Sequence, residues 1–422
     1  MSDINVVHAA SLAQIHDSGS VRRGATQSDL DLITDGAVAI RNGRIVAVGS
    51  TAEVLATHGT GNVSTIDARG KCVLPGLVEC HSHPLFAGDR HHEYAERLGG
   101  ASLAEVAARG GGIWSSVVAT RRASDEELLA KLSTALQRIG AGGVTTLEVK
   151  SGYGLTVDEE LRGLELLQRA RSMTPMQLAI TFLGAHVVPR DLEGDAETRG
   201  SRYTDLIGGD MLAAVVGQGI AEFQDVTIEQ NHFTPDQGSQ LMRRSHESGL
   251  PVRVHADAWA PSQGWLTAVE GGAVSAEHLT YTPDDEIRNV GRTDTVAVIL
   301  PMAELVYMTN RRANARLFID CEVPVAVATD YCSSIRATSL LTTVAVAAPW
   351  FRMTPGEVIV GATLNAAYSL GRQSSCGSLD VGKRGDLVIL DCSHPDEVFL
   401  AIGAPLLRQV VIAGRVVVGE QP

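Results

Sequence analysis

The sequence predicts an α/β protein in which a (β/α)8 TIM barrel is inserted into a small β-sandwich formed by both chain termini. Three observations support this prediction. Residues 73–365 alternate apolar strand-like runs with helical patterns. Residues 1–72 and 366–422 contain short strand-like runs. The length of 422 residues accommodates a barrel of roughly 250 residues together with a second, smaller domain.

Both ends of the chain are predicted to be β-rich. The expected strands are residues 5–9, 36–41, 44–48, 64–67, 385–391, 410–413 and 416–418. Asn42 and Gly43 separate the second and third strands and match a type I′ turn, which needs positive φ at both central residues. We expect the two ends to share one sandwich, and the alternative is two separate β appendages.

Eight strands are predicted in the middle of the chain. They are residues 73–81, 144–150, 178–183, 222–229, 252–255, 273–278, 296–300 and 324–329. Helical patterns lie between them, for example at residues 124–140 and 158–171. Ser124 with Glu127 is a predicted capping box, and Asp158 is the predicted cap of the next helix. Eight such alternations are typical of a barrel whose active site lies at the carboxyl ends of the strands.

Polar residues collect at these predicted strand ends. His81 and His83 are two residues apart on one strand, so their side chains point the same way. Of the 13 histidines, those at strand ends are His81, His83, His186, His255 and His278, and Asp330 follows the last strand. A single such histidine is more often a hydrogen-bonded core residue, and Asp330 alone would be a helix cap. Their joint occurrence on one rim indicates a metal site.

A metal site would supply the nucleophile for hydrolysis of an unactivated amide or amidine carbon, because a metal lowers the pKa of bound water from 15.7 to about 7. The predicted ligands are His81, His83, His255 and Asp330. Asp330 would also carry the proton of the water, and His278 would polarise the substrate or orient the water. Glu229 would bridge if two metals were bound. One divalent metal is expected; zinc is the default for this ligand set, and iron or manganese is compatible.

Composition excludes several kinds of partner. The net charge of −14 and the lack of a dense Lys/Arg patch argue against nucleic acid and anionic membrane surfaces. No apolar run approaches the roughly 20 residues that span a bilayer, and the N-terminal residues do not resemble a signal peptide. Six cysteines without CxxC pairs indicate reduced thiols. These features predict a cytoplasmic protein.

Several motifs resemble the amidohydrolase superfamily. The run Val-x-Pro-Gly-Leu-Val-x-x-His-Ser-His at residues 73–83, with His255, His278 and Asp330, is similar to its metal-binding pattern, and residues 377–388 resemble its return strand. Within the superfamily, the chain resembles the imidazolonepropionases of histidine breakdown over almost its whole length. The stretches that carry this resemblance are residues 83–90, 108–113, 148–155 and 181–186.

The resemblance implies substrate contacts. Arg90 and Tyr153 would bind a propionate group, and His186 would contact the ring; an arginine fork suits a carboxylate. Tyr94 follows Arg90 by one helical turn and would line the same pocket. Lys150 has no expected ligand role, and a structural salt bridge is its predicted use. The implied partner is a small carboxylate-bearing substrate of imidazolone or hydantoin type, and a homodimer is the family expectation.

Two residues depart from the imidazolonepropionase pattern. Ala258 stands where the family has a glutamate expected to handle ring protons, and Cys332 where it has an asparagine that would bond the ring. The loss of these polar side chains changes the discrimination between substrates, because a buried polar group of the substrate is left without a hydrogen-bond partner. Two hypotheses for hydrolysis at C2 of the ring therefore stay open. One is imidazolonepropionase activity, and the other is the desulfhydrase reaction of ergothioneine breakdown on 3-(5-oxo-2-thioxoimidazolidin-4-yl)propionate.

Two further hypotheses belong to other classes. A deaminase of a nitrogenous ring would share the metal ligands, but such enzymes generally need an acid beside the strand-five histidine, where this chain has Ala258. A catalytically inactive binding protein would be indicated by a missing ligand, and all four are present. Metal analysis would separate this last hypothesis from the others.

Overall fold

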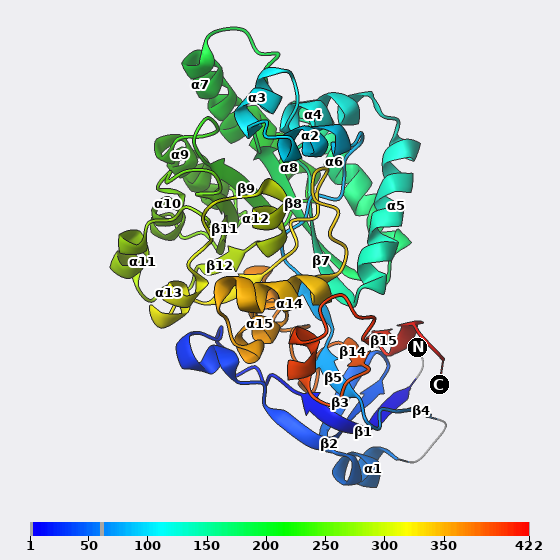
Figure 1. Cartoon of the computed structure of the whole chain (residues 1–422). Helices are drawn as coiled ribbons and strands as arrows, with labels where there is room; N and C mark the ends of the chain where they lie inside the picture. Colours follow the sequence, from blue (N-terminus) through cyan, green and yellow to red (C-terminus); the bar gives the residue numbers. More distant parts are fainter. Residues whose placement is uncertain (1–2, 60–62, 422) are drawn as a thin grey trace.

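The computed structural model describes residues 3–59 and 63–421. Two parts lie one above the other in Figure 1: a barrel of parallel strands covered by helices, and a sheet made of strands from both chain ends. The predicted fold class is thereby confirmed. Within the described ranges, every helix is too short or too polar to cross a bilayer.

The terminal sheet has the strand order β16-β15-β14-β5-β1-β2-β3, and β4 pairs with β1. Its strands are β1 (Ile4–Ala13), β2 (Leu32–Arg41), β3 (Arg44–Ser50), β4 (Ser64–Asp67), β5 (Cys72–Pro75), β14 (Leu387–Leu390), β15 (Leu407–Ile412) and β16 (Arg415–Val418). Because β5 pairs antiparallel with β14, the alternative of two separate appendages is wrong. Val38, Ile389 and Val411 pack in one core, so side chains from both chain ends are buried together. Asn42 and Gly43 have φ of 51° and 78°, as the predicted turn requires.

The barrel contains eight strands in the order β6 to β13, each parallel to its neighbours. They are β6 (Leu77–Glu79), β7 (Val144–Lys150), β8 (Gln177–Ala185), β9 (Phe223–Ile228), β10 (Val252–Ala256), β11 (Ser275–His278), β12 (Val296–Ile299) and β13 (Val325–Val327). Between β6 and β13, both carboxylate oxygens of Glu79 accept the N–H of Thr329, and a bridge joins Ser82 to Tyr331. This closure sets the end of the first strand beside the end of the last.

The predicted first strand, residues 73–81, is two strands that belong to different sheets. β5 lies in the terminal sheet and β6 in the barrel, and the N–H of Gly76 between them donates to the carbonyl of Asp386. A Cβ atom at Gly76 would lie 2.3 Å from Oγ1 of Thr145, so only glycine fits this crossing. The chain thus enters the barrel at Gly76, and the domain boundaries after residues 72 and 365 stay a prediction.

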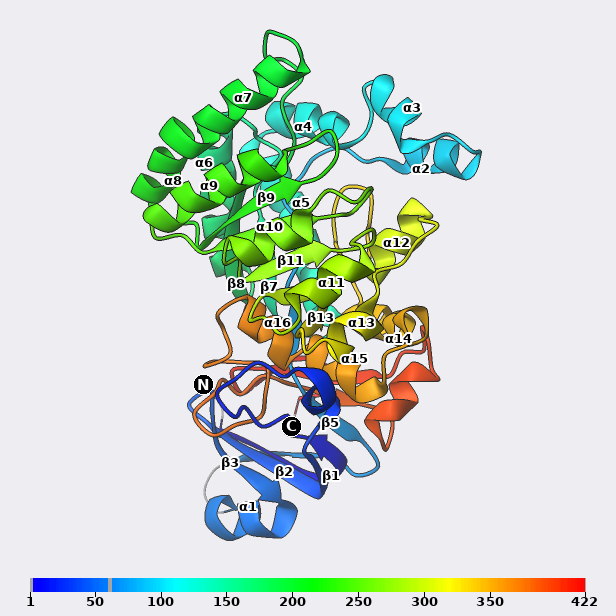
Figure 2. The ribbon, with the colours of Figure 1, turned by 90° about the vertical axis from the view of Figure 1, so that its left-hand side faces the viewer.

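Helices cover the barrel, and Figure 2 shows α2 and α3 projecting from its body. The helices are α1 (Thr51–His58), α2 (His91–Leu98), α3 (Leu103–Ala108), α4 (Ile113–Arg122), α5 (Asp125–Ala141), α6 (Val157–Ala170), α7 (Ala196–Leu206), α8 (Leu212–Gln218), α9 (Pro235–Glu247), α10 (Gly264–Glu270), α11 (Asp284–Val290), α12 (Pro301–Tyr307), α13 (Ala315–Asp320), α14 (Leu340–Phe351), α15 (Pro355–Gly361) and α16 (Leu364–Ser369). Ser124 and Glu127 form the predicted capping box of α5. The predicted cap Asp158 is wrong: Thr156 caps α6 with its side chain, and Asp158 lies inside the first turn.

Candidate metal centre and active site

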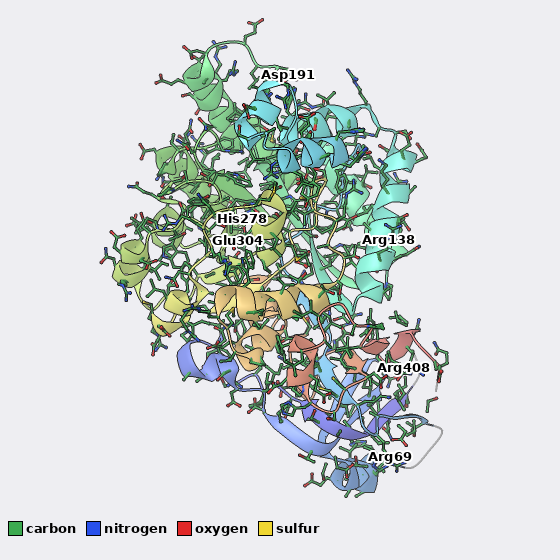
Figure 3. The ribbon with its side chains drawn as sticks, viewed as in Figure 1. Arg69, Arg138, Asp191, His278, Glu304 and Arg408 are labelled. Carbon is green, nitrogen blue, oxygen red and sulfur yellow. The ribbon has the colours of Figure 1, made fainter. Side chains whose placement is uncertain are left out.

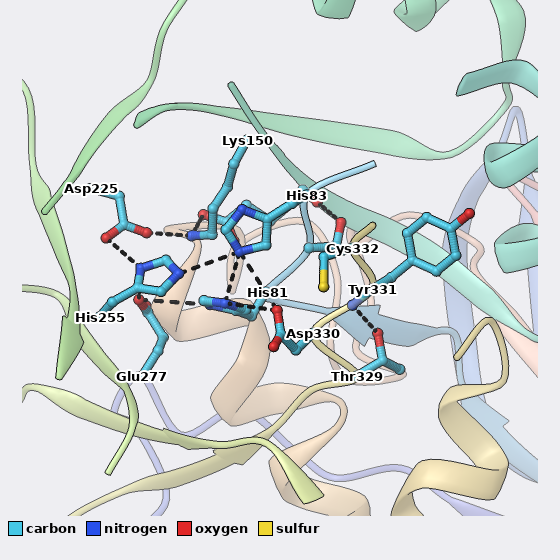
Figure 4. A network of polar contacts seen from close by, with 12 residues as sticks. His81, His83, Lys150, Asp225, His255, Glu277, Thr329, Asp330, Tyr331 and Cys332 are labelled. Carbon is cyan, nitrogen blue, oxygen red and sulfur yellow. Dashed lines mark hydrogen bonds and ion pairs between the residues drawn. The ribbon is translucent and has the colours of Figure 1, made fainter. Parts of the chain in front are cut away.

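Three histidine rings meet where β6 and β10 end. Nε2 of His83 lies 3.2 Å from Nε2 of His81 and 3.3 Å from Nε2 of His255 (Figure 4). Oδ1 of Asp330, which follows β13, lies 3.6 Å from Nε2 of both His81 and His83. All four side chains are buried. The structure therefore brings together all four residues predicted as ligands.

The arrangement fits a tetrahedral metal. Metal–nitrogen distances of about 2.0–2.1 Å place neighbouring ligand atoms about 3.3 Å apart, which matches the separations between the Nε2 atoms. A proton between two of these nitrogens would satisfy that pair alone, and the third lone pair would stay buried without a partner. A cation at the common point would satisfy all of them.

Burial sets the protonation of these rings. It lowers the pKa of His81, His83 and His278 well below the usual value, so these imidazoles are neutral and can act as ligands or acceptors. His255 differs, because Asp225 outweighs the effect of burial and raises the pKa of this ring. Burial raises the pKa of Asp330 to about 7. The nearby cationic groups lower this pKa, but they offset only part of the rise.

His278 lies at the end of β11, within the barrel part of the molecule (Figure 3). Its backbone φ of 75° is rare for a residue with a side chain. The N–H of the next residue, Leu279, donates to the carbonyl of Ala256 over 3.0 Å and holds this turn. The ring of His278 lies 5.5 Å from that of His81 and 5.3 Å from that of His255, centroid to centroid. The ring of His278 therefore borders the cluster of candidate metal ligands without joining the close group of Nε2 atoms.

A second group of possible metal ligands is already engaged in ion pairs. Asp225, His255 and Glu277 also lie close enough to share a cation. Their carboxylates are already bonded, however: Lys150 lies 2.7 Å from Asp225, and Arg253 lies 2.8 Å from Glu277. The predicted salt bridge of Lys150 is confirmed by this contact.

Glu229 lines the same cavity as His83 and His255, but among the described residues it is not in the group close enough to share a cation with them. Its carboxylate accepts the N–H groups of Gln230 and Trp259 over 2.8 and 2.9 Å, and the hydroxyl of Ser262 over 2.9 Å. It instead fixes the loop that follows β10.

One cavity is lined by three of the candidate metal ligands, His83, His255 and Asp330, and by most of the predicted substrate contacts. The predicted residues that line it include Arg90, Tyr153, His186, Ala258, His278 and Cys332. Nε of Arg90 donates to Glu93 over 2.7 Å, and this carboxylate also accepts from Ser115 and Gly112. Among the described residues, the two terminal nitrogens of Arg90 have no carboxylate partner and so can receive one from a ligand.

Tyr94 does not line the cavity, contrary to the prediction. Its side chain lies on α2 and is 40% exposed. The prediction assumed that Arg90 and Tyr94 share a helix face. Arg90 instead precedes the first helical residue, with φ of −125° and ψ of 24°, so its side chain leaves the helix in another direction.

A buried carboxylate shapes the loop that carries Tyr153. Glu160 on α6 accepts the N–H groups of Gly152, Gly154 and Leu155 over 3.1, 2.9 and 2.8 Å. The carbonyl of Gly152 in turn lies 2.9 Å from Nδ1 of His186. When Nδ1 donates to this carbonyl, Nε2 of His186 is left as an acceptor for a ligand.

The two departures from the family pattern line the same cavity. Asp257 holds the Ala258 loop by accepting the N–H groups of Ser262, Gly264 and Trp265. Sγ of Cys332 lies 3.3 Å from the hydroxyl of Ser334, which lies 2.7 Å from the hydroxyl of Tyr307. Burial raises the pKa of Cys332 to about 11, so a neutral thiol faces the cavity.

Sequence reasoning missed several cavity residues. They are Ile113, Thr227, His232, Trp259, Tyr307 and Ser334. His232 comes four residues after the last residue of β9, and this spacing could have been noticed. Tyr307 ends α12, whose preceding strand ends in apolar residues, so no local pattern pointed to it.

The barrel and its histidine rim define a hydrolase of the amidohydrolase class: the chain belongs to the amidohydrolase family, whose model matches residues 72–417. A second model, an imidazolonepropionase-like composite domain of bacteria, matches residues 36–59. The chain is accordingly an imidazolonepropionase-like amidohydrolase, as the sequence motifs predicted.

Curated relatives match this chain along its length. The imidazolonepropionase of Symbiobacterium thermophilum is 39% identical over 421 residues, which cover 99% of this chain and 98% of the relative. The imidazolonepropionase of Streptococcus pyogenes serotype M1 is 35% identical over 419 residues, which cover 99% and 98%.

Solved structures support the fold. A triazine hydrolase variant has a TM-score of 0.73 at 17% identity and covers 99% of this chain and 95% of its own. An adenosine deaminase from Xanthomonas campestris with bound zinc has a TM-score of 0.70 at 18% identity, with coverages of 99% and 93%. Both are similar to this chain in fold.

Proposed function

We propose that this chain binds one divalent metal ion and hydrolyses an imidazolone-type ring that carries a propionate group. The proposed metal is zinc. The proposed ligands are His81, His83, His255 and Asp330. When bound, the metal would lower the pKa of a water molecule and so supply the nucleophile. The observation that carries the proposal is that Arg90 and the histidine cluster line one cavity.

Side chains of the protein bind the substrate and transfer the protons. Arg90 and Tyr153 bind the carboxylate and so place the ring over the histidine cluster. His186 contacts the ring, and His278 donates to or orients the group under attack. Asp330 takes a proton from the attacking water at its carboxylate and passes it to the leaving atom.

For the substrate, we favour a C2 thione, 3-(5-oxo-2-thioxoimidazolidin-4-yl)propionate. Water adds to C2, the C–S bond breaks, and both protons of the water leave with sulfur as hydrogen sulfide, so that C2 becomes a carbonyl. A thione sulfur is larger and a weaker hydrogen-bond acceptor than oxygen. The methyl group of Ala258 and the neutral thiol of Cys332 suit it better than the charged or amide side chains of the family pattern.

Imidazolone propionate is the second candidate, because the curated relatives are named imidazolonepropionase. In that reaction water opens the ring at a C–N bond, and no sulfide forms.

A direct assay distinguishes the two candidates. Zinc-loaded protein is incubated with each compound, while ring absorbance and free sulfide are followed together, with Asp330→Asn as the inactive control. Sulfide release from the thioxo compound, with little opening of the imidazolone, supports the favoured substrate. Enzyme-like turnover of imidazolone propionate with an untouched thioxo compound would refute it.

The proposed setting of this reaction is the cytoplasm, with a small molecule as the partner. A homodimer is expected from the family resemblance. Light scattering of the purified chain should give twice the mass of 44.6 kDa.

A further inference from the structure

Five buried charged side chains of alternating sign lie beneath the histidine cluster. In order, they are Glu277, Arg253, Glu148, Lys150 and Asp225. The successive links measure 2.8, 2.9, 2.8 and 2.7 Å, and all five side chains are fully buried. We call this set the charge chain. Arg253 is further fixed by the carbonyls of Ser369 and Cys80.

The carboxylates at the two ends of the charge chain lie near the Nδ1 atoms of two candidate metal ligands. Oδ1 of Asp225 lies 2.9 Å from Nδ1 of His255, and Oε2 of Glu277 lies 3.7 Å from Nδ1 of His81. An acceptor at Nδ1 keeps the ring proton there and leaves the lone pair of Nε2 for the metal. Asp225 thus holds the ring of His255 by a hydrogen bond on the side away from the cluster (Figure 4), whereas 3.7 Å is too long for one and Glu277 contributes only a negative charge near His81.

Lys150 links the two carboxylates at one end of this chain. Its ammonium group bonds Oδ2 of Asp225, and the other oxygen of that carboxylate bonds His255. Without the ammonium group, the charge chain would hold three buried carboxylates, Asp225, Glu148 and Glu277, and one cation, Arg253. The rotation of the Asp225 carboxylate would no longer be fixed, and neither would the acceptor at His255.

We propose that Lys150 is a positioning residue of the metal centre: through Asp225 it fixes the ring of His255 so that Nε2 points at the metal. This inference rests on the metal site proposed above. Loss of such outer contacts typically weakens metal binding 10- to 100-fold.

The test compares two methionine substitutions of buried lysines. Lys150→Met removes the ammonium group of the charge chain. Lys383→Met is the matched control, because Lys383 is also buried, with a side chain 8% exposed, and pairs with Asp17 over 3.0 Å away from the histidines. Zinc affinity of metal-free protein is measured by competition with a chromophoric chelator, and folding by circular dichroism.

Lys150→Met is expected to bind zinc 10- to 100-fold more weakly than wild type, and Lys383→Met within twofold of wild type. A folded Lys150→Met protein that binds zinc as tightly as Lys383→Met overturns the inference. If Lys150→Met does not fold, the double variant Lys150→Met/Asp225→Asn replaces it, because neither partner of the Lys150–Asp225 ion pair is then charged. A zinc affinity of this double variant equal to that of wild type would also overturn the inference. Wild-type protein that binds no divalent metal would refute the proposed metal site, and this inference with it.

Discussion

The Nε–H of Arg90 donates to Oε2 of Glu93 over 2.7 Å in the wall of the cavity. The same carboxylate accepts from Gly112 and Ser115, so it joins the start of α2 to the start of α4. The proposed carboxylate clamp is therefore held in place before a substrate arrives, and this lowers the cost of ordering it on binding.

Arg90→Met should weaken substrate binding. A charge-assisted hydrogen bond contributes about 1.5–3 kcal/mol, so KM for a propionate substrate should rise roughly 10- to 100-fold with a smaller change in kcat. Steady-state kinetics measure both constants. Arg109→Met is the control, because Arg109 pairs with Glu96 on the surface. An unchanged KM for Arg90→Met would mean that the propionate binds elsewhere.

Glu160→Ala should destabilise the protein and disturb the Tyr153 loop. Three buried N–H groups would lose their acceptor, at a cost of about 1–3 kcal/mol for a single unsatisfied group. Urea unfolding measures the loss, and Glu165→Ala on the exposed face of the same helix should change stability by less than about 0.5 kcal/mol. Equal stabilities of the two variants would contradict this account of the loop.

Ala258→Glu combined with Cys332→Asn should shift selectivity towards imidazolone propionate. The pair restores the polar groups of the family pattern, and an unpaired buried polar group disfavours the thione by roughly 1–3 kcal/mol. The value of kcat/KM for the thioxo compound, divided by that for imidazolone propionate, should therefore fall about tenfold or more. Cys332→Ser is a conservative comparison and should change this ratio less. A ratio that does not move would show that these two positions do not select the substrate.

Metal removal should lower thermal stability. A ligand that binds only the folded protein adds about 4 kcal/mol when its concentration is 1,000 times Kd. Chelator treatment should therefore reduce Tm by several degrees, and added zinc should restore it. Asp330→Asn should respond less to zinc than wild type. Identical Tm values with chelator and with zinc would argue against the proposed site.

Asp17 should contribute stability that is lost in acid. Burial alone would raise its pKa, but hydrogen bonds from Lys383, Tyr368 and Gly19 bring the pKa below the ordinary value of 3.8. A lowered pKa in the folded state stabilises it above the unfolded value, and this contribution disappears as the pH falls through the folded pKa. Asp17→Asn should thus be less stable than wild type at pH 7, and the difference should shrink below pH 3.8. Urea unfolding over this range tests it, and a difference that does not vary with pH would contradict it.

Much of the fold could be predicted because its signals are local. Alternating strand and helix patterns are visible within windows of a few residues, and Asn42-Gly43 specifies its turn without help from the rest of the chain. The split at Gly76 was missed because an apolar run looks the same whether it forms one strand or passes between two sheets. The cap of α6 was misplaced by two residues for a similar reason, since Thr156 and Asp158 are both good capping residues.

The sequence by itself determined the barrel, the terminal sheet and the set of strand-end residues from which a metal site can be built. Strand ends are marked locally, and parallel strands bring their carboxyl ends to one rim. Only the tertiary structure decided that Tyr94 is exposed and does not line the cavity, that Trp259 and Tyr307 line it, and that Lys150 reaches Asp225. Lys150 and Asp225 are 75 positions apart, so their contact depends on how the strands are placed around the barrel, which no local pattern encodes.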